Sequence, residues 1–360
     1  MSSFLFYVGA LWTLRWIWLW LGWQKSARNA LSGPESPVTV IVAAHNEEVN
    51  LPSLLSSLSQ MRYSDWEMVL VLDRCEDQSK EVALSWQKRL PMLRIVEIVS
   101  TEPGWSPKKW AIRCGIEEAN HENLAFTDAD CRVQPDWLRC INAQFRAGAG
   151  LVLGIGLYDR HTSLLNFVIQ AETAFTAFQY IGEAGWGRPY MGVGRNLAYQ
   201  KSLFMEIGGF STHQDVLSGD DDLLVQSLAM YTKSAVMKGK RAATLSVPKQ
   251  TWSSWWRQKS RHVSSSRKYS LHSQAILAAF HLLHGVWWIL VLTGLLFHSL
   301  TFADVFSLYL WRIGFSVLAW APMSRSLNFP WWGYPALDLI FFLYNLFVIP
   351  WGLIRRPAWT

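Results

Sequence analysis

The chain has 360 residues, of which 51% are hydrophobic, and it contains 22 tryptophans. Its formal net charge is +6, and much of the basic excess lies beside apolar segments, where Lys and Arg favour anionic lipid headgroups over nucleic acid. The four cysteines form no CxxC pair and have no histidine at zinc-finger spacing. This pattern excludes a zinc finger and is typical of reduced, structural thiols in a cytoplasmic domain.

Residues 4–23 form an apolar run that is long enough to cross a bilayer as a helix of about 20 residues. Arg15 is its only charged residue, and we expect this charge to pair inside a helix bundle or to reach the interface. A cleaved signal peptide is the alternative, although no Lys or Arg precedes the run. We therefore predict that residues 1–30 form a membrane anchor and its linker.

The next segment alternates between strand-like and helical patterns. Residues 38–43 are a continuous apolar run, typical of a strand buried on both faces. Helical spacing at residues 50–60, 78–89 and 110–119 alternates with strand-like runs at 68–72, 93–99 and 124–127. This alternation predicts a mostly parallel, Rossmann-like α/β sheet, in which ligands bind at the carboxyl ends of the strands. We assign residues 31–250 to this domain.

Acidic residues follow three of the predicted strands. They are Glu47 and Glu48 after the first strand, Asp73, Glu76 and Asp77 after the second, and Asp128 and Asp130 after the fourth. Each cluster alone is typical of a helix cap or a solvated turn. Three clusters at successive strand ends instead predict a site for Mg²⁺ or Mn²⁺. These cations prefer oxygen ligands and are commonly coordinated by both carboxylates and a diphosphate.

Two further motifs lie at residues 192–199 and 218–222. The first is rich in glycine, and it is either a tight turn or a place where backbone approaches a ligand. The second contains Asp220, Asp221 and Asp222, whose adjacent charges raise the pKa of at least one carboxyl group unless they are compensated. One of them is a candidate general base, and an acidic first turn of a helix is a compatible structural explanation.

Residues 251–272 mix Trp with Arg and Lys, which predicts an interfacial helix, and Gln258 and Arg261 share one of its faces. Residues 273–360 contain three apolar stretches, at 275–300, 305–321 and 337–354. The middle stretch is short and carries Arg312, so we expect either a span or a re-entrant helix there. Basic residues flanking the spans place residues 25–272 in the cytoplasm. If Arg355 and Arg356 are also cytoplasmic, only two of the three late stretches cross.

The order of these motifs over residues 37–270 resembles glycosyltransferase family 2, the inverting enzymes of GT-A fold that include membrane-bound synthases of polysaccharides and glycolipids. The segment from Val40 to Glu48 looks like the opening strand and loop of that family. Residues 72–77 look like its nucleoside-contacting motif, and residues 219–221 match the motif whose last Asp is the base. Residues 258–262 look like Gln-x-x-Arg-Trp, with His262 in place of Trp.

The resemblance implies a role for each candidate residue. Asp221 is the expected base, followed by Asp220, and Asp130 with Asp128 is expected to bind Mn²⁺ or Mg²⁺. The expected donor-binding residues are Glu47, Asp73, Asp77, Lys108, Asp128, Gln258 and Arg261. The implied reaction moves a sugar from a nucleotide-sugar donor to a lipid or lipid-linked acceptor at the cytoplasmic face of a bacterial inner membrane.

Two other functions remain open, namely a processive polysaccharide synthase of the same family and a membrane-bound nucleotidyltransferase. The complete acidic series disfavours a non-catalytic scaffold. The large α/β domain, with only one N-terminal and two to three C-terminal transmembrane helices, disfavours a transporter.

Overall fold

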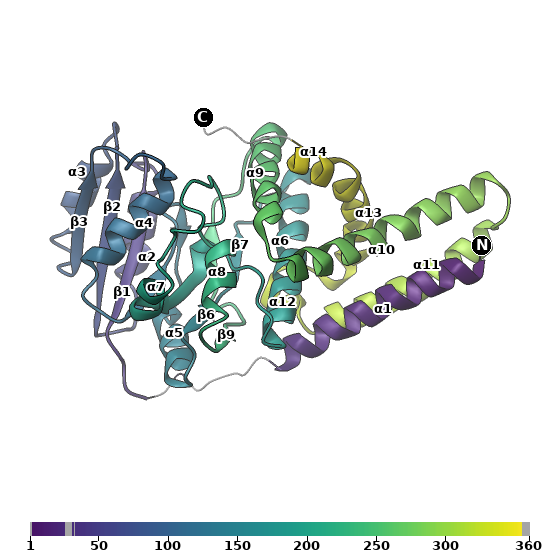
Figure 1. The fold of residues 1–360 in the computed structure, drawn as a ribbon, viewed down its shortest axis with the longest axis horizontal. Coiled ribbons are helices and arrows are strands. Elements are labelled where there is room, and N and C mark those ends of the chain that lie inside the picture. The colour runs from purple at the N-terminus through teal and green to yellow at the C-terminus, as the bar shows by residue number, and fades with distance from the viewer. Residues whose placement is uncertain (1, 26–30, 32, 355–360) are drawn as a thin grey trace.

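The computed structural model describes residues 2–25, 31 and 33–354, and within them an α/β domain lies at one end and a group of long helices at the other (Figure 1). The α/β domain contains a seven-stranded sheet of order β3-β2-β1-β4-β8-β6-β9. Its strands are β1 (Val38–Ala44), β2 (Trp66–Asp73), β3 (Leu93–Ile98), β4 (Asn123–Phe126), β6 (Leu151–Leu153), β8 (Leu197–Gln200) and β9 (Ser234–Val236). The first four in chain order pair in parallel, whereas β8 runs antiparallel to both β4 and β6. A three-stranded sheet, β5 (Cys131–Arg132), β10 (Thr244–Ser246) and β7 (Gly156–Tyr158), adjoins it.

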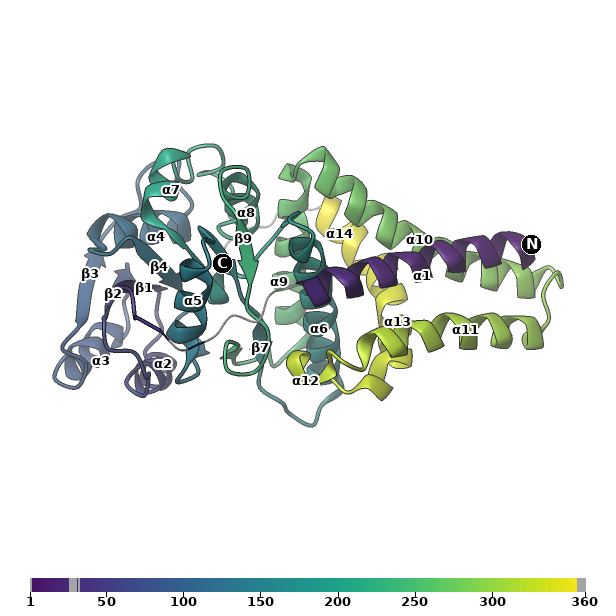
Figure 2. The same ribbon diagram turned by 90° about the horizontal axis from the view of Figure 1, so that it is seen from below.

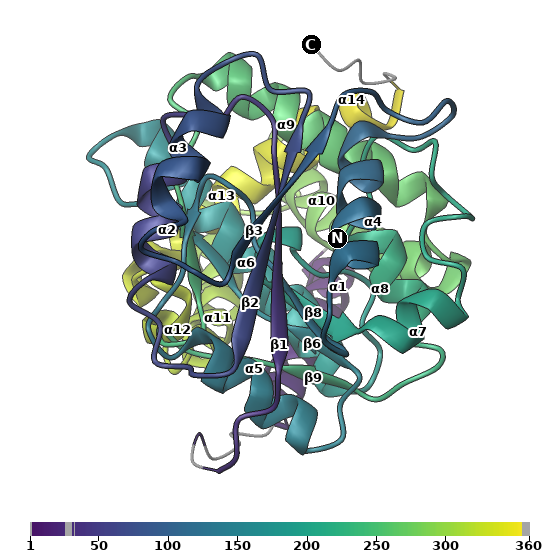
Figure 3. The ribbon, with the colours of Figure 1, turned by 90° about the vertical axis from the view of Figure 1, so that its left-hand side faces the viewer.

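Helices cover both faces of the large sheet (Figure 3). On one face, α2 (Leu51–Leu58), α3 (Ser79–Trp86) and α5 (Trp137–Arg146) contribute apolar side chains to a core with alternate residues of β1 and β2. On the other face lie α4 (Pro107–Glu118), α7 (Lys201–Glu206) and α8 (Asp222–Leu228). Burial on both faces explains why β1 and β2 are nearly continuous apolar runs in the sequence. The predicted helices and strands between residues 38 and 127 are confirmed, with ends that shift by up to three residues.

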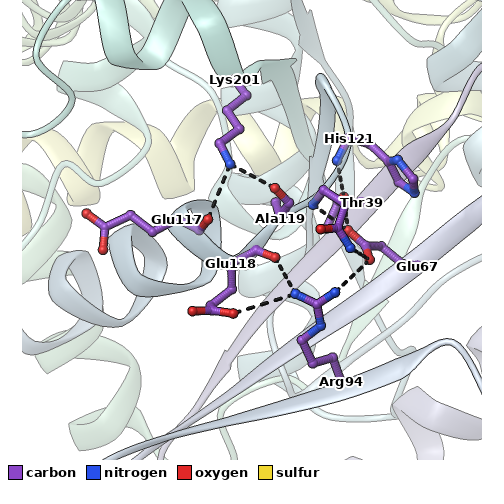
Figure 4. Close-up of polar contacts among 9 residues, drawn as sticks. Thr39, Glu67, Arg94, Glu117, Glu118, Ala119, His121 and Lys201 are labelled. Atoms are coloured by element: carbon purple, nitrogen blue, oxygen red, sulfur yellow. Dashed lines mark hydrogen bonds and ion pairs between the residues drawn. The ribbon is translucent and has the colours of Figure 1, made fainter.

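A polar cluster fixes the amino edge of the sheet, opposite the strand ends that carry the acidic motifs (Figure 4). Glu67 accepts hydrogen bonds from Thr39 at 2.7 Å and from the backbone and side chain of Asn120 at 2.7 Å. Arg94 reaches Glu67 at 3.5 Å and the Glu118 carbonyl at 2.6 Å. Partial burial alone would raise the pKa of Glu67, but these hydrogen bonds hold it below its usual value. The cluster joins β1, β2 and β3 to the end of α4.

Three helical segments form a layer that runs crosswise between the sheet domain and the remaining long helices (Figures 1 and 2). They are α6 (Leu164–Gly185), α9 (Trp252–Ser265), and the continuous segment of α13 (Tyr334–Leu343), a π-helix (Tyr344–Val348) and α14 (Ile349–Ile354). A buried ion pair between Lys259 and Glu172 joins α9 to α6. Short helical turns complete the chain at Gly194–Asn196, Ser266–Lys268, α12 (Ser324–Leu327) and Trp331–Gly333.

Beyond this layer, α1 (Ser2–Lys25), α10 (Leu271–Leu296) and α11 (Phe302–Trp320) run side by side as a stalk, with the chain turning back between α10 and α11 (Figures 1 and 2). Four helices in the described part of the chain are long and apolar enough to cross a membrane: these three and the 334–354 segment. One lies near the N-terminus and three follow the α/β domain, as the sequence predicts.

Arg15, the charge within α1, pairs with Glu183 of α6 at 2.5 Å. The Glu183 side chain is 1% exposed, so the ion pair lies at the buried contact between the anchor and the crosswise layer. The ion pair compensates for the unfavourable placement of the Arg15 charge in an apolar helix. It also fixes the position of α6 along α1.

Replacing Arg15 by Met is expected to destabilise the protein by about 3 kcal/mol, because it leaves the Glu183 carboxylate buried without its partner. The thermal midpoint of the detergent-purified protein measures this loss. The double variant Arg15→Met/Glu183→Met should recover most of it, since no unpaired charge remains. A double variant less stable than either single variant would show that the two side chains stabilise the fold independently.

Candidate active site

Carboxylates converge where β1 and β4 end. Asp128 and Asp130 follow β4, and Glu47 follows the adjacent β1. A small cavity lies beside them, lined by Ala43 and Ile41 of β1, Thr127 and Asp128 after β4, and residues from α4 and the later loops. Burial raises the pKa of Glu47, and the charges of Asp130 and Asp128 add to this effect. The two strand ends therefore present one acidic site.

Lys108, in the first turn of α4, connects two of the predicted acidic motifs across the cavity. Its ammonium lies 3.0 Å from an Asp128 oxygen and 2.9 Å from an Asp220 oxygen. Gly194 lies next to this bridge, since a Cβ there would be 3.4 Å from Asp220 and 3.6 Å from the Lys108 ammonium. The glycine-rich segment thus brings backbone close to the polar groups of the cavity, and the same segment begins a turn of 3₁₀-helix.

The aspartate triplet has three different environments. Asp221 is the N-cap of α8 and accepts hydrogen bonds from the backbone N–H groups of Gly194 and Asp222, both at 2.8 Å. Asp222 is not among the residues that line the cavity, and it accepts a 2.5 Å hydrogen bond from the Tyr269 hydroxyl. The acidic helix start is therefore confirmed, and it coexists with a carboxylate at the cavity.

Their surroundings separate the pKa values of Asp220 and Asp221. Burial alone would raise the pKa of Asp220, but the charge and hydrogen bond of Lys108 hold it below its usual value. Burial and the neighbouring Asp220 carboxylate raise the pKa of Asp221 to about 6. A carboxylate with a pKa near 6 is better matched to accepting a proton near neutral pH than one held by an ammonium.

The residues after β4 suit a hard divalent cation. Asp128, Asp130 and Cys131 bring possible ligand atoms within 4.8 Å of one another. Burial raises the pKa of the Cys131 thiol well above its usual range, and this thiol lies 3.0 Å from the Ser246 hydroxyl, so the two carboxylates are the fitting ligands. Burial and the charge of Asp128 raise the pKa of Asp130, and a cation held by these carboxylates would relieve the repulsion.

Asp73, the last residue of β2, and Asp77, in the loop after it, lie at the same edge of the sheet but make local contacts. Asp73 holds Arg74 with two hydrogen bonds of 2.8 and 2.9 Å. Asp77 accepts hydrogen bonds from the backbone N–H groups of Glu48 and Ser79, both at 3.0 Å. Asp77 therefore fastens the loop after β2 to the loop after β1, and neither carboxylate has a described contact with the β4 pair.

Gln258 and Arg261 lie one turn apart on α9, a helix of the crosswise layer. Farther along α9, the Ser265 hydroxyl lies 3.4 Å from an Asp222 oxygen. The helix that carries the Gln-x-x-Arg motif thus passes the acidic site, although no described contact joins Gln258 to the carboxylates.

Two buried side chains hold the site in place. Lys109 is 1% exposed and donates to the carbonyls of His213, Val216 and Ser218 at 2.6, 2.9 and 3.1 Å, which ties α4 to the loop before the aspartate triplet. Asn196 is fully buried, and its side chain bonds Trp137 and the carbonyls of Ile155 and Ala242. The resemblance to family 2 pairs Lys109 with Lys108 as basic residues near the donor, whereas Asn196 is marked in the sequence only by its place in the glycine-rich segment.

Several known proteins are similar to this chain. The model of glycosyl transferase family 21 matches residues 3–348. The probable glycosyltransferase YdaM of Bacillus subtilis is 24% identical over 233 residues, which are 62% of this chain and 54% of that protein. A dolichyl-phosphate beta-glucosyltransferase of Drosophila melanogaster is 33% identical over 107 residues, 27% of this chain and 32% of that protein. The matched segments thus span about half or less of these curated relatives.

Among solved structures, the mannosyltransferase PcManGT from Pyrobaculum calidifontis, in complex with GDP-Man and Mn²⁺, superimposes with a TM-score of 0.60 at 18% identity. The likeness covers 95% of this chain and 99% of that one. At this identity it shows the fold, and it confirms the predicted GT-A-like α/β architecture.

Proposed function

Because the chain belongs to glycosyl transferase family 21, we propose that this glycosyltransferase moves one sugar from a nucleotide-sugar donor to a lipid or lipid-linked acceptor, with inversion, at the cytoplasmic face of a membrane. The family differs from family 2, which the motif order resembles, while the class of enzyme is the same. The observation that carries the proposal is the convergence of Asp128, Lys108 and Asp220 at one cavity, beside an Asp221 of raised pKa.

The donor diphosphate is placed at the β4 end of the cavity. Asp130 and Asp128 would hold a divalent cation there, which would offset the negative charge of the departing nucleoside diphosphate. The Mn²⁺ in the complex of the mannosyltransferase neighbour supports this cofactor. Lys108 stands between this end and Asp220, where its ammonium can exchange a carboxylate for a phosphate oxygen.

Asp221 is assigned as the base that takes the proton from the acceptor hydroxyl as that oxygen attacks the anomeric carbon. Both of its oxygens already accept one backbone hydrogen bond, which fixes the carboxylate, and each retains a lone pair for the proton. Direct attack from the face opposite the leaving group needs no covalent sugar intermediate and inverts the anomeric centre.

Donor contacts come from two sides. Glu47 follows β1, and Asp73 and Asp77 lie at the end of β2 and in the loop after it; we assign these residues to the nucleoside. Gln258 and Arg261 of α9 are assigned to close the site from the membrane side, since α9 belongs to the crosswise layer. That position, together with the lipid acceptor in the name of the dolichyl-phosphate relative, supports a lipid acceptor for this chain.

Nucleoside diphosphate release tests this function directly. The detergent-purified protein would be given a panel of nucleotide sugars with Mn²⁺ or Mg²⁺, with and without a membrane lipid extract. We expect one preferred donor, release only with metal, and a higher rate with lipid. Release of pyrophosphate from a nucleoside triphosphate would instead identify a nucleotidyltransferase, and no release from any donor would contradict the proposal.

A further inference from the structure

The helical segment at residues 334–354 runs in a different direction from the other apolar helices. It is 21 residues long and its mean hydropathy is 1.9, so length and composition alone predict a membrane span. In two perpendicular views it lies crosswise to α1, α10 and α11, and it runs in roughly the same direction as α6 and α9 (Figures 1 and 2). Viewed from the sheet end, it crosses the molecule obliquely (Figure 3).

A buried charge network fixes this segment at one depth along the stalk. Asp338 of α13 forms a bidentate pair with Arg312 of α11, with both contacts at 2.8 Å, and also contacts His284 of α10 at 3.2 Å. Arg312, Asp338 and His284 are no more than 2% exposed. Asn345, in the π-helical turn, adds contacts to His281 at 2.8 Å and to His284 at 3.1 Å.

The positions of these partners give the depth. At 1.5 Å per residue, His284 lies roughly 18 Å from the end of α10 at Leu296, and Arg312 lies roughly 15 Å from the start of α11 at Phe302. These lengths are about half of the roughly 30 Å hydrocarbon thickness that the stalk would cross. A helix that meets the stalk near its middle, and runs across it, does not reach the far surface.

The outward face of the segment is apolar. Leu339, Leu343, Leu346 and Phe347 are each about half exposed, and Ile354 is 83% exposed. Such a face is unfavourable in water and is suited to acyl chains. The opposite face packs on the helices of the crosswise layer, with α14 against α9 and α13 against α6.

We propose that the 334–354 segment does not cross the membrane but lies within the leaflet next to the catalytic domain, with its exposed apolar face against acyl chains. The chain then crosses three times, through α1, α10 and α11. The C-terminal end falls on the same side as the catalytic domain. The Arg312–Asp338 pair is the anchor that makes this possible, because it gives Arg312 a partner within the apolar layer and attaches the segment to the stalk.

The charge pattern of the sequence supports this topology independently. Lys25 at the end of α1 and the basic residues of α9 mark the catalytic side of the membrane. Arg355 and Arg356 directly follow the segment in the sequence, and three crossings would put them on that same side. Four crossings would put them on the opposite side, against the tendency for basic residues to flank spans in the cytoplasm.

Side-specific cysteine labelling tests the topology. Ala358→Cys, Lys88→Cys in the catalytic domain and Ser299→Cys between α10 and α11 would each be made in the full chain. Sealed vesicles of known orientation would be treated with a membrane-impermeant maleimide, and peptide mass spectrometry would separate the new sites from the native cysteines. We expect positions 358 and 88 to be labelled in the same vesicles and position 299 in vesicles of the opposite orientation. Labelling of position 358 together with position 299 would overturn the proposal.

A depth measurement tests the placement within the leaflet and does not depend on the C-terminal label. A genetically encoded spin-labelled amino acid at position 339 or 353 would report its depth in liposomes through collisions with oxygen and with a water-soluble nickel complex. The two positions are about 21 Å apart along a helix. Depths that differ by much less than this length are expected, whereas a difference close to it would show a crossing helix. Neither measurement depends on sugar transfer, so the topology and the proposed function fail separately.

Discussion

The Asp221→Asn enzyme is expected to lose at least about 100-fold in kcat, because an amide cannot take the proton of the acceptor hydroxyl. Donor binding should change little, since Asp221 contacts the backbone of Gly194 and Asp222 rather than the β4 carboxylates. Initial rates of nucleoside diphosphate release, together with donor binding measured by calorimetry, separate the two effects. Near-normal turnover in this variant would show that another group is the base.

The pH profile gives the same assignment a second readout. Burial and the Asp220 charge raise the pKa of Asp221 to about 6, so the carboxyl group is protonated below that pH and cannot act as a base. The kcat/KM of the wild-type enzyme should therefore fall as the pH decreases through about 6. The residual activity of Asp221→Asn should not show this decrease at acidic pH.

Two matched variants sharpen this experiment. Asp65→Asn makes the same chemical change at an exposed position outside the site and should leave the rate and the pH profile unchanged. Asp220→Asn removes the partner of Lys108 and the charge that raises the pKa of Asp221. In Asp220→Asn, the decrease of kcat/KM at acidic pH should shift to lower pH, and the activity should remain above that of Asp221→Asn. A complete loss in Asp220→Asn with activity kept in Asp221→Asn would exchange the two roles.

The second large effect on turnover is expected when the divalent metal is removed. Dialysis against a chelator should abolish turnover, and Mn²⁺ or Mg²⁺ should restore it, because the leaving diphosphate then regains a counter-charge. Asp130→Asn should lower kcat/KM on the order of 100-fold or more, with a higher metal concentration needed for half-maximal rate. Mn²⁺ binding followed by electron paramagnetic resonance provides a readout without turnover.

The Asp65→Asn protein serves again as the control, with wild-type metal dependence expected. Full activity of the chelator-treated wild-type enzyme, or an unchanged metal requirement in Asp130→Asn, would contradict the metal assignment. The roles of Asp128 and Lys108 would then need another explanation, since the ion pair between them could by itself balance the charge of the site.

Strands β1 to β4 were predictable because apolar runs mark them in the sequence, whereas β6, β8 and β9 of the same sheet were not predicted. Residues 38–43, for example, correspond to β1 almost from end to end. The acidic residues at the strand ends were predictable for a related reason. Parallel strands bring their carboxyl ends to one edge of the sheet, so residues that follow these strands in the sequence lie near one another in the fold.

The direction of the helices in the crosswise layer was not predictable from the sequence. Nothing in the apolar pattern of residues 334–354 gives its direction, because a helix lying in a leaflet and a helix crossing it need similar side chains. The direction depends on Asp338 meeting Arg312, a contact between residues 26 apart that sit on different helices. In the same way, the partner of Arg15 lies on α6, a helix that the sequence reading did not predict.

Asp222 illustrates a different limit. Within a triplet of identical residues, the sequence does not show which carboxylate faces the cavity and which is buried. The structure separates them, because Asp222 is held by Tyr269 from the turn after α9 and Asp220 by Lys108 from α4. Both partners are distant in the chain, so only the fold assigns the roles.

The most direct test of the proposed reaction is the mass of its product. Purified wild-type enzyme, the preferred donor, metal and a membrane lipid extract would be incubated, and the lipids would be compared by mass spectrometry with those from Asp221→Asn. A single lipid class heavier by one sugar, formed only by the wild-type enzyme, and with an anomeric configuration opposite to that of the donor, is the predicted result. A ladder of sugar additions, a retained configuration or a water-soluble polymer would contradict single, inverting transfer to a lipid.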